Sequence, residues 1–556
     1  LILELFNCGE DTVTERNDFS QKNRAAKIPA AKAAEINEKL QSLDRLAAES
    51  DAVAEEMQLL VQELKQPMQV RAHLFFSLEK NMQYIQDILG TDIKLVSATY
   101  PLEQFSVGVA YIESLSDHEV INNQIIGPLV AAKLAPGINL ADIPRQLQFK
   151  IISTAGIQKT TSMDQILGSL LNGDTVLFID GLNNALIIAS RKVETRAIER
   201  PQFEGTVLAD LESFTENIET NGSMIIKRLP NSSLRFENFT KGSLSRTKIQ
   251  LIWLEGIANP TVVKEARRRL EAINIDSIDG AGTLGQLIED SPYSIFPKYR
   301  QTERPDLAAR SLIEGRFVIL CDISPFAIVA PISLWDNLKT MDDYGERSTS
   351  ASYLRFVRYI AFLMSILLSP IYLSFVTYNH TIVPQSLAVA IATGRAGVPF
   401  PSVVELLLMT LAITVIREAA MRIPGSVGYF VGTLAAVVIG QATVAAGYVS
   451  ASIIIVVATS EISAFAISTS NLVYATRLIN YFFIILAGMF GMFGLINGIA
   501  IIFWHIASLE SFGVPYIYPL VPFELSAMRD TFVRIGVLQK RFKIFAPFNR
   551  LRSKRN

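Results

Sequence analysis

The sequence predicts an α/β N-terminal module, in two subdomains, followed by a multi-pass α-helical membrane domain. Half of the 556 residues are hydrophobic and 19% are charged, which excludes a disordered chain. Residues 1–355 carry 37 basic and 47 acidic side chains, residues 356–528 carry five of each, and residues 529–556 carry nine basic and one acidic. These counts indicate an acidic soluble front, an almost uncharged middle and a basic tail. Two distant cysteines, Cys8 and Cys321, indicate no disulfide framework.

The acidic front divides into a helical arm and two subdomains. Residues 1–66 form the arm, which is rich in Ala, Glu, Lys and Gln and has apolar residues near helical spacing. Strand and helix patterns then alternate, and they place the subdomains at 67–200 and 201–345. The predicted helix 260–272 has Pro in its first turn and Arg towards its last, which suits the helix dipole. The predicted strands are 105–112, 175–179, 185–189, 248–254, 274–278, 316–321 and 326–329.

Apolar windows dominate residues 346–528, the predicted transmembrane helical domain of four to six spans. Each window has the ~20 apolar residues that a hydrocarbon layer of about 30 Å requires. The 30-residue window 478–507 must tilt or break, and its glycines offer places to break. The segment 385–424 is interrupted by Gly and Pro, which predicts broken or re-entrant helices. The four windows are 359–378, 425–447, 448–470 and 478–507.

Basic residues near the windows predict the orientation of the chain. The tail 529–556 lies close behind the last window, and Arg347, Arg355 and Arg358 flank the first one. By the positive-inside bias, both the N-terminal module and the basic tail are therefore cytoplasmic. The number of crossings must then be even, four or six.

Polar residues inside the apolar half are the candidate functional residues, because a charge at the centre of a lone helix costs ~2.5–3.5 kcal/mol. Glu461 lies in mid-window beside serines such as Ser463, so it either lines an aqueous ion path or pairs with a neighbouring helix. Gly440 permits close packing, and Gln441 and Thr443 add hydrogen-bonding groups to the same candidate path or gate. Charges nearer the window ends are candidates for structural or coupling roles, namely Arg395, Glu405, Arg417, Glu418 and Arg477.

Few features of the sequence favour an enzyme. Residues 280–285 read Gly-Ala-Gly-Thr-Leu-Gly, the dinucleotide-binding glycine pattern, but only the short helix 286–291 fits before Pro292. A simple turn is therefore favoured over a nucleotide site. The four histidines are isolated from one another and from the cysteines, and no nucleophile elbow, P-loop or zinc-protease helix occurs in the sequence. We expect no catalytic residue, no cofactor, no metal and no nucleic-acid partner.

Several motifs, in order from about residue 66 to 520, resemble the A subunit family of spore germinant receptors. The chain has Leu-Glu-Gly-Ile-Ala-Asn-Pro at 254–260 and Ser-Phe-Gly-Val-Pro-Tyr at 511–516. It departs from the family at 208–214, where Leu-Ala-Asp-Leu-Glu-Ser-Phe replaces Arg-Gly-Pro-Arg-Glu-Gly-Phe, so it resembles a divergent member. The other matching motifs are Pro-Tyr-Ser at 292–294, Phe-Pro at 296–297, Thr-Glu-Arg-Pro-Asp at 302–306, Glu-Gly-Arg at 314–316, Ser-Pro-Phe at 324–326, Gly-Val-Pro-Phe-Pro at 397–401, Arg-Glu-Ala at 417–419 and Ile-Gly-Gln-Ala at 439–442.

The resemblance implies a receptor complex in the inner membrane of a spore. The expected partners are membrane lipid, further copies of the chain, a multi-span B subunit and a lipoprotein C subunit. The A subunit would form or gate a monovalent-cation pathway that triggers germination. One alternative is a secondary transporter or accessory export subunit, because broken helices at mid-membrane often bind substrate. A second is a membrane-tethered enzyme with a ligand-filled cleft at 280–285.

Overall fold

The computed structural model describes residues 73–89, 93–102, 105–131, 143–147, 157–192, 201, 204, 210–423, 438–523, 528 and 531–534. The predicted helical arm 1–66, nearly all of the tail 529–556 and the first half of the window 425–447 lie outside these residues. Residues 70–556 form one compact unit.

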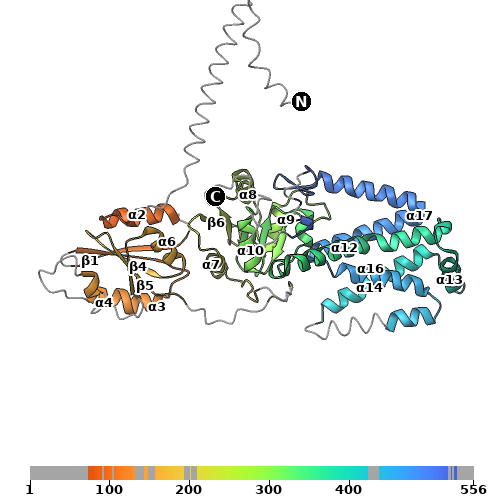
Figure 1. Ribbon diagram of the computed structural model, residues 1–556, viewed down its shortest axis with the longest axis horizontal. Helices are drawn as coiled ribbons and strands as arrows, with labels where there is room; N and C mark the ends of the chain where they lie inside the picture. Colours follow the sequence, from red (N-terminus) through yellow and green to blue (C-terminus); the bar gives the residue numbers. More distant parts are fainter. Residues whose placement is uncertain are drawn as a thin grey trace, which may run out of the picture. The chain divides into compact units, whose positions relative to one another are not determined.

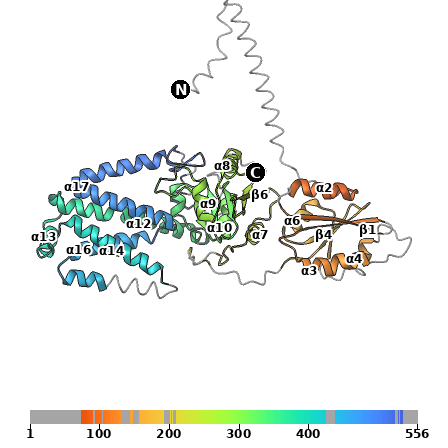
Figure 2. The same cartoon turned by 180° about the vertical axis from the view of Figure 1, so that it is seen from behind.

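The first subdomain is a five-stranded sheet with helices on both faces. The strand order is β1-β2-β4-β5-β3, and every neighbouring pair is antiparallel. Helices α2 and α6 cover one face, and α3 and α4 cover the other (Figures 1 and 2). The elements are α2 (Leu78–Leu89), β1 (Leu95–Leu102), β2 (Phe105–Ile112), α3 (His118–Val120), η1 (Ile121–Ile126), α4 (Gly127–Ala131), α5 (Ile143–Gln146), β3 (Ile157–Thr160), α6 (Met163–Leu171), β4 (Thr175–Ile179) and β5 (Ala185–Ile188).

The second subdomain repeats this arrangement. Its order is β6-β7-β9-β10-β8, again fully antiparallel. In both subdomains a helix precedes a hairpin, helices lead to an edge strand, and another helix leads to a second hairpin. The elements are α7 (Ile218–Arg228), β6 (Leu234–Lys241), β7 (Thr247–Leu254), α8 (Pro260–Ala272), α9 (Ala281–Ile288), β8 (Arg300–Thr302), α10 (Pro305–Ile313), β9 (Phe317–Cys321) and β10 (Ala327–Ala330).

Side-chain alternation explains why the central strands are apolar throughout. In β2, Val107 and Val109 enter one core, whereas Ala110 and Ile112 enter the core on the opposite face. Neighbouring side chains of a strand point to opposite faces, so a strand with helices on both sides needs apolar residues at every position. The predicted mixture of helices and strands is confirmed, and the sheets are antiparallel.

A helical domain follows, joined to the second subdomain by two short helices. Within α12, Pro370 lies inside the helix. Residues 438–445 are also helical. The elements are η4 (Leu334–Leu338), α11 (Asp342–Gly345), α12 (Ser348–Thr377), η5 (His380–Ile382), α13 (Gln385–Arg395), α14 (Ser402–Met421), α16 (Ala451–Ala464), α17 (Ser470–Ser508), β11 (Glu510–Ser511) and β12 (Val514–Pro515).

The long helix α17 is two helices joined at Gly491, so of the two predicted alternatives, a tilt or a break, the window 478–507 has the break. Gly491 has φ 61° and ψ −142°, which lies outside the helical region and favours glycine. A Cβ on Gly498 would lie 2.7 Å from the side chain of Leu486, so the second arm folds back along the first. The first arm, 21 residues at 1.5 Å each, is roughly 31 Å long. This length suits a bilayer.

The helical domain has two ends, which we name the junction end and the far end. At the junction end, Leu472 and Ile506 from both arms of α17 share a core with Leu338. At the far end, the Tyr378 hydroxyl donates to the Gly488 carbonyl at 2.8 Å, beside the turn of α17. The helices therefore run between one end that meets the soluble module and one that does not.

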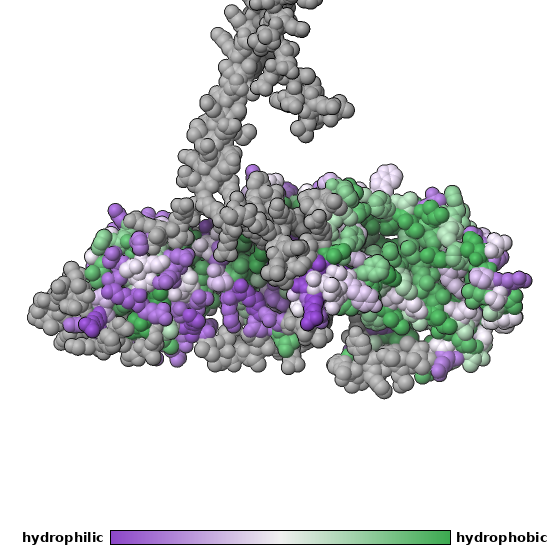
Figure 3. All heavy atoms as spheres, viewed as in Figure 1, coloured by the Kyte–Doolittle hydropathy of each residue, from purple (hydrophilic) through white to green (hydrophobic). Residues whose placement is uncertain are grey.

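Two helices in the described part of the chain, α12 and α17, are long and apolar enough to cross a membrane. Only a third of each apolar stretch is buried, whereas a core helix of a soluble protein is mostly buried. On the face that Figure 3 shows, apolar side chains dominate the helical domain, whereas polar side chains are more frequent over the sheets. The apolar helix α16 has 14 residues, so the window 448–470 gives a helix shorter than predicted.

Two predictions around the glycine run are wrong. Residues 274–278 form no strand; the Ile278 carbonyl instead accepts a hydrogen bond from the Thr247 hydroxyl at 3.0 Å. The following helix starts at Ala281, inside the glycine run, rather than at 286. Its Gly285 lies under Tyr299, whose ring would be 2.3 Å from a Cβ at this position. Close packing of α9 therefore explains this glycine.

Candidate functional site

Glu461 lies in a buried ion cluster that joins three helices. Its Oε2 is 3.1 Å from Nη2 of Arg417 on α14 and 3.7 Å from Nε of Arg477 on α17. The Arg417 guanidinium also lies 4.2 Å from the centre of the Phe465 ring. Of the two predicted alternatives for Glu461, the structure has the ion pair. A buried carboxylate needs such partners, because isolated charges are costly in an apolar medium.

A second buried ion pair lies at the far end. Glu405 near the start of α14 is fully buried, and its carboxylate lies 3.2 Å from Nη2 of Arg395 at the end of α13. The other carboxylate oxygen accepts a hydrogen bond from the Ser450 amide at 3.0 Å. Glu405 of α14 thus connects the end of α13 with the start of α16. By contrast, Glu418 pairs with Arg422 on the exposed face of α14.

The remaining candidates are not gathered around Glu461. The Ser463 hydroxyl donates to Thr459 of its own helix at 2.7 Å, and the Thr443 hydroxyl donates to Gly440 at 3.1 Å. Gln441 is exposed. Among the described residues, no hydrogen bond or ion pair joins Gly440, Gln441 or Thr443 to Glu461. A common path through them stays a prediction.

Pro370 creates a polar site in the middle of the helical domain. Proline has no N–H, so the carbonyl of Ile366, four residues earlier, lacks its usual helical donor. Asn480 on α17 supplies one, with its Nδ2 at 3.0 Å from Ile366 O and 3.1 Å from Ser365 O. The Ser460 hydroxyl on α16 also donates to Ser365 O at 2.9 Å. Helices α12, α16 and α17 are thus hydrogen-bonded to one another at the proline.

The junction between the soluble module and α12 is a buried ion cluster centred on Asp343. One Asp343 oxygen is 2.9 Å from Nε of Arg355, and the other is 3.2 Å from Nη2 of Arg358. Asp343 and Arg355 are each only 1% exposed. Burial raises the pKa of Asp343, but attraction by Arg358 and Arg355 outweighs it and the pKa is lowered. The start of α12 is therefore fixed to α11 by charge as well as by covalent connection.

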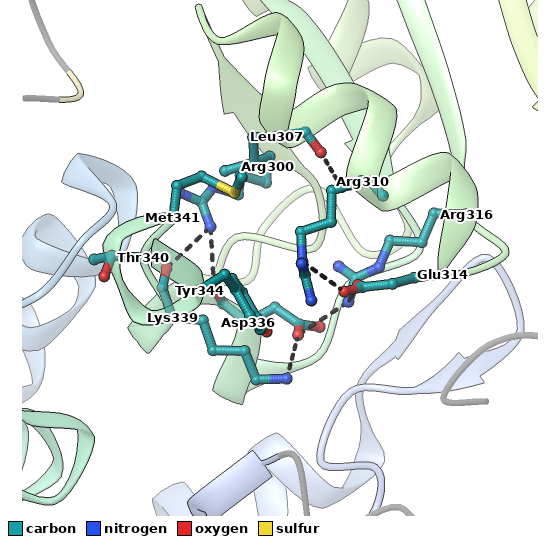
Figure 4. Close-up of a pocket in the computed structure, with 11 residues that line it drawn as sticks. Arg300, Leu307, Arg310, Glu314, Arg316, Asp336, Lys339, Thr340, Met341 and Tyr344 are labelled. Carbon is teal, nitrogen blue, oxygen red and sulfur yellow. Dashed lines mark hydrogen bonds and ion pairs between the residues drawn. The ribbon is translucent and has the colours of Figure 1, made fainter. Parts of the chain in front are cut away.

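A second carboxylate, Asp336 of η4, connects the sheet of the second subdomain to this junction through ion pairs (Figure 4). Its Oδ1 lies 3.0 Å from Nη2 of Arg316 and 3.1 Å from Nζ of Lys339. Burial raises the pKa of Asp336, but Arg316 and Lys339 bring it well below its ordinary value. Arg310 stacks on Tyr344, with 3.2 Å between its guanidinium carbon and the ring centre. The cavity among these side chains is only about 40 Å³, so the cluster is packed rather than open.

The chain after α17 returns into the second subdomain. Phe512, in the hairpin of β11 and β12, packs edge-on against Phe317 of β9 at 4.9 Å between ring centres. Its amide donates to Asp290 at 2.8 Å, and the Arg269 guanidinium lies 4.4 Å from its ring. Tyr516 is fully buried and receives a hydrogen bond from Asn337 at 3.2 Å. The first and last described helices of the helical domain are therefore both anchored in the second subdomain.

The glycine run at 280–285 contacts neighbouring residues at both of its ends. The Ala281 amide, at the start of α9, donates to the Ser324 hydroxyl at 3.3 Å. Gly285 is covered by Tyr299. In the described part of the chain, no group of three His, Cys, Asp or Glu side chains could hold a metal ion. Close packing therefore accounts for Gly285, and a φ of 153° accounts for the glycine at 280.

The chain thus combines a soluble module of helices and antiparallel sheets with an apolar helical domain that includes two helices long enough to cross a bilayer, and buried ion pairs join the two parts. The model of the family described as Bacillus/Clostridium GerA spore germination protein matches residues 77–543. The chain is 36% identical over 462 residues to spore germination protein KA of Bacillus subtilis, covering 83% of this chain and 84% of that protein. The chain belongs to this GerA family of spore germination proteins.

Two further proteins are similar to this chain. The chain is 34% identical to the uncharacterized membrane protein YfkQ of Bacillus subtilis, covering 77% of this chain and 82% of that one. A crystal structure of the N-terminal domain of the A subunit of the Bacillus megaterium spore germinant receptor GerK3 matches 47% of this chain and 96% of its own. Its identity is 29% and its TM-score is 0.39.

The junction cluster is the part of the site that sequence reasoning missed. Arg355 and Arg358 served only to orient the chain, and Asp343 was not among the predicted site residues. The available signal was an acidic residue 12 and 15 positions before two arginines at the edge of an apolar window. Such arginines need a counter-charge if they are buried.

Proposed function

We propose that the chain is the A subunit of a nutrient-germinant receptor complex and that it forms or gates a path for monovalent cations. Its membership of the GerA family supports the receptor role. The observation that carries the gating role is the double anchorage, through Asp343 at the start of α12 and Phe512 after α17. A movement of the second subdomain is then passed to both the first and the last helix of the helical domain.

The helical domain crosses the bilayer six times in this proposal. α12 runs from the junction end to the far end, α14 returns, and the two arms of α17 add one crossing in each direction. α16 starts at the far end, where the Ser450 amide contacts Glu405, and ends near Thr469, whose hydroxyl donates to Asn337. Residues 438–445 belong to the crossing that precedes α16. An even number leaves the N-terminal module and the tail in the cytoplasm.

Glu461 acts as a gating residue in this proposal. With its carboxylate held between Arg417 and Arg477, it offers no free oxygen pair to a passing cation. A shift of α14 or α17 that separates one arginine exposes the carboxylate to the path. Rings of acidic side chains select cations in channels, and copies of the chain around an axis would form such a ring. Gly440, Gln441, Thr443 and Ser463 are the further candidates for the path.

The partners and location follow the same proposal. The complex contains further copies of this chain, a multi-span B subunit and a lipoprotein C subunit in the spore inner membrane. Lipid surrounds the exposed apolar side chains of α12, α14 and α17. The soluble module acts without catalysis.

The transporter alternative is less well supported by the geometry. The transporter prediction was based on broken helices near the middle of the membrane, where substrates often bind. The interruption between α13 and α14 instead lies at the far end, where Glu405 pairs with Arg395 and contacts Ser450. A saturable flux of one solute through the purified chain would nevertheless favour a transporter over a channel.

The test is a Glu461→Gln variant with Glu418→Gln as the matched control. We expect Glu461→Gln to change conductance or germination with the amount of subunit in the membrane unchanged, because the amide keeps the shape and loses the charge. Glu418 forms an exposed pair on α14, so its replacement should change neither. Loss of the Glu461→Gln protein from the membrane would mean that Glu461 is structural only.

A further inference from the structure

The loop between α9 and β8 presents an aromatic side chain that nothing described in the chain covers. Tyr293 is 100% exposed, and Ile295 is also exposed. The Ser294 amide donates to Ser291 O at 3.0 Å, which makes residues 291–294 a turn with Tyr293 near its tip. Single exposed apolar residues are normal on a protein surface, so the case depends on how this loop is held and where it lies.

The loop is held rigidly from both sides. Ser291 has φ 45°, in the left-handed region that a residue other than glycine adopts only when its surroundings require it. Behind the turn, the buried Lys298 ammonium donates to Ser291 O at 2.7 Å and lies 3.4 Å from Glu289. Phe296 is buried in the core shared with the helical domain. The tyrosine is therefore fixed in its exposed position instead of being free to fold back.

The loop lies beside the last turn of α17. The Ser294 hydroxyl is 3.1 Å from Nε2 of His505, and the Phe296 ring lies 6.0 Å from the His505 ring. Trp504, the residue before His505, is 77% exposed. Trp and Tyr gather where a bilayer meets water, because their rings are apolar and their N–H or O–H groups remain hydrated. Tyr293 is thus attached to a membrane-helix end at the level of the lipid headgroups.

We infer that the turn 291–294 inserts Tyr293 into the headgroup region of the leaflet that faces the soluble module. The second subdomain then touches the bilayer directly, in addition to its junction with the helices. Ile295 contributes apolar surface to the same contact. The occupant is lipid, because the contact continues the apolar surface of α17. This inference rests on the proposed membrane crossing of α17.

The experiment places an environment-sensitive fluorophore on Tyr293→Cys in the full chain, with Cys8 and Cys321 replaced, reconstituted into phosphatidylcholine vesicles. Vesicles that carry a nitroxide near the lipid headgroups should quench the fluorescence of this label. The emission of the label should also shift to the blue. The matched control is Leu244→Cys, which is 80% exposed in the turn before β7. That turn precedes the first residue of β7, whereas Phe317 and Phe512 lie beside the other end of the strand. We therefore expect no quenching of a label at 244.

The outcomes separate this inference from the membrane proposal. A label at Ile496, an exposed residue of α17, should be quenched by nitroxides deep in the acyl chains. Quenching of the label at 496 without quenching of the label at 293 would contradict the lipid contact of Tyr293 and leave the membrane crossing intact. Absence of quenching at 496 would contradict the membrane crossing of α17. Blue-shifted emission at 293 without quenching would mean that protein covers the loop, which also overturns a lipid contact. Ile295→Cys provides a second position if Tyr293→Cys does not fold.

Discussion

The two soluble subdomains have the same strand order and the same sequence of helices, yet the buried ion pairs and the aromatic contact to the helical domain described above all come from the side of the second. In the first, the pair between Lys94 and Glu113 is exposed on both sides. At the junction of the second with the helical domain, Asp336 and Asp343 are buried and each meets two cationic groups. The shared fold therefore does not create the connection. A few buried charges and the returning hairpin around Phe512 do.

The contrast explains how a repeated fold can serve two roles. A buried ion pair contributes little net stability over an apolar pair of the same shape, but breaking it is costly because one charge then lies unpaired. Such a pair fixes two elements in one arrangement. The second subdomain is thereby held in one arrangement with the helical domain.

The largest expected effect follows from Asp343→Asn. It leaves Arg355 and Arg358 buried without their counter-charge, and we expect a loss of about 3–5 kcal/mol in the free energy of unfolding. Chemical unfolding of the protein in detergent measures it. The control is Lys94→Gln in the first subdomain, where an exposed pair contributes only about 0.2–1 kcal/mol. Equal losses in the two variants would remove the difference between the subdomains.

The pH dependence of unfolding sharpens the same comparison. The pKa values of Asp336 and Asp343 are lower in the folded protein than the 3.8 of a free side chain. Their contribution to stability is therefore complete above about pH 4 and is lost as the pH falls through the folded values. We expect a smaller acid-induced loss of stability in Asp343→Asn than in the unchanged protein. Identical pH profiles would contradict a charged Asp343 in the junction.

Gly491→Ala tests the turn in α17. The positive φ and the Tyr378 ring, 2.9 Å from a Cβ at this position, predict a loss of about 1–3 kcal/mol. Gly394→Ala in α13 is the control, because nothing lies within 4 Å of its Cβ position and alanine favours a helix. Thermal unfolding in detergent distinguishes the two variants. An unchanged Gly491→Ala protein would mean that α17 does not reverse there.

The smallest effect is expected at the proline in α12. Asn480→Leu removes the donor to the Ile366 carbonyl, and hydrogen bonds between membrane helices contribute about 0.6–1.7 kcal/mol. Asn497→Leu is the control, because that side chain is exposed and donates only to Phe493 of its own helix. Unfolding in detergent should rank Asn480→Leu as the less stable of the two, and the reverse order would contradict the role of Asn480.

Local patterns predicted the strands and helices where the chain has a single strong period or a clear break. The strand 105–112, the helix 260–272 and the glycine break in 478–507 were found because apolar spacing, Pro and Gly act within a few residues. The segment 274–278 was wrongly predicted as a strand. Its Ile278 is buried because a loop, and not a strand, carries it into a core. Local spacing cannot show such a contact with distant residues.

The candidate site was predicted in part. The cost of a buried charge marked Glu461 as either paired or water-facing and left Glu405 and Arg417 as candidates for structural or coupling roles. Each of the three has an ionic partner in the structure, and their functional roles stay predictions. Which arginine meets which acid depends on how α14, α16 and α17 pack, and no short motif encodes that. The junction cluster was missed for the same reason, since Asp343 and Arg355 come together only when α11 packs on α12.

Nutrient-evoked cation current across a bilayer that holds the assembled complex tests the central claim most directly. We predict a current with the unchanged chain and its loss with Asp343→Asn, provided that the variant is present in the complex in equal amount. Current that persists unchanged in Asp343→Asn would contradict transmission through the junction. Absence of current from a folded and fully assembled complex would contradict the cation path itself.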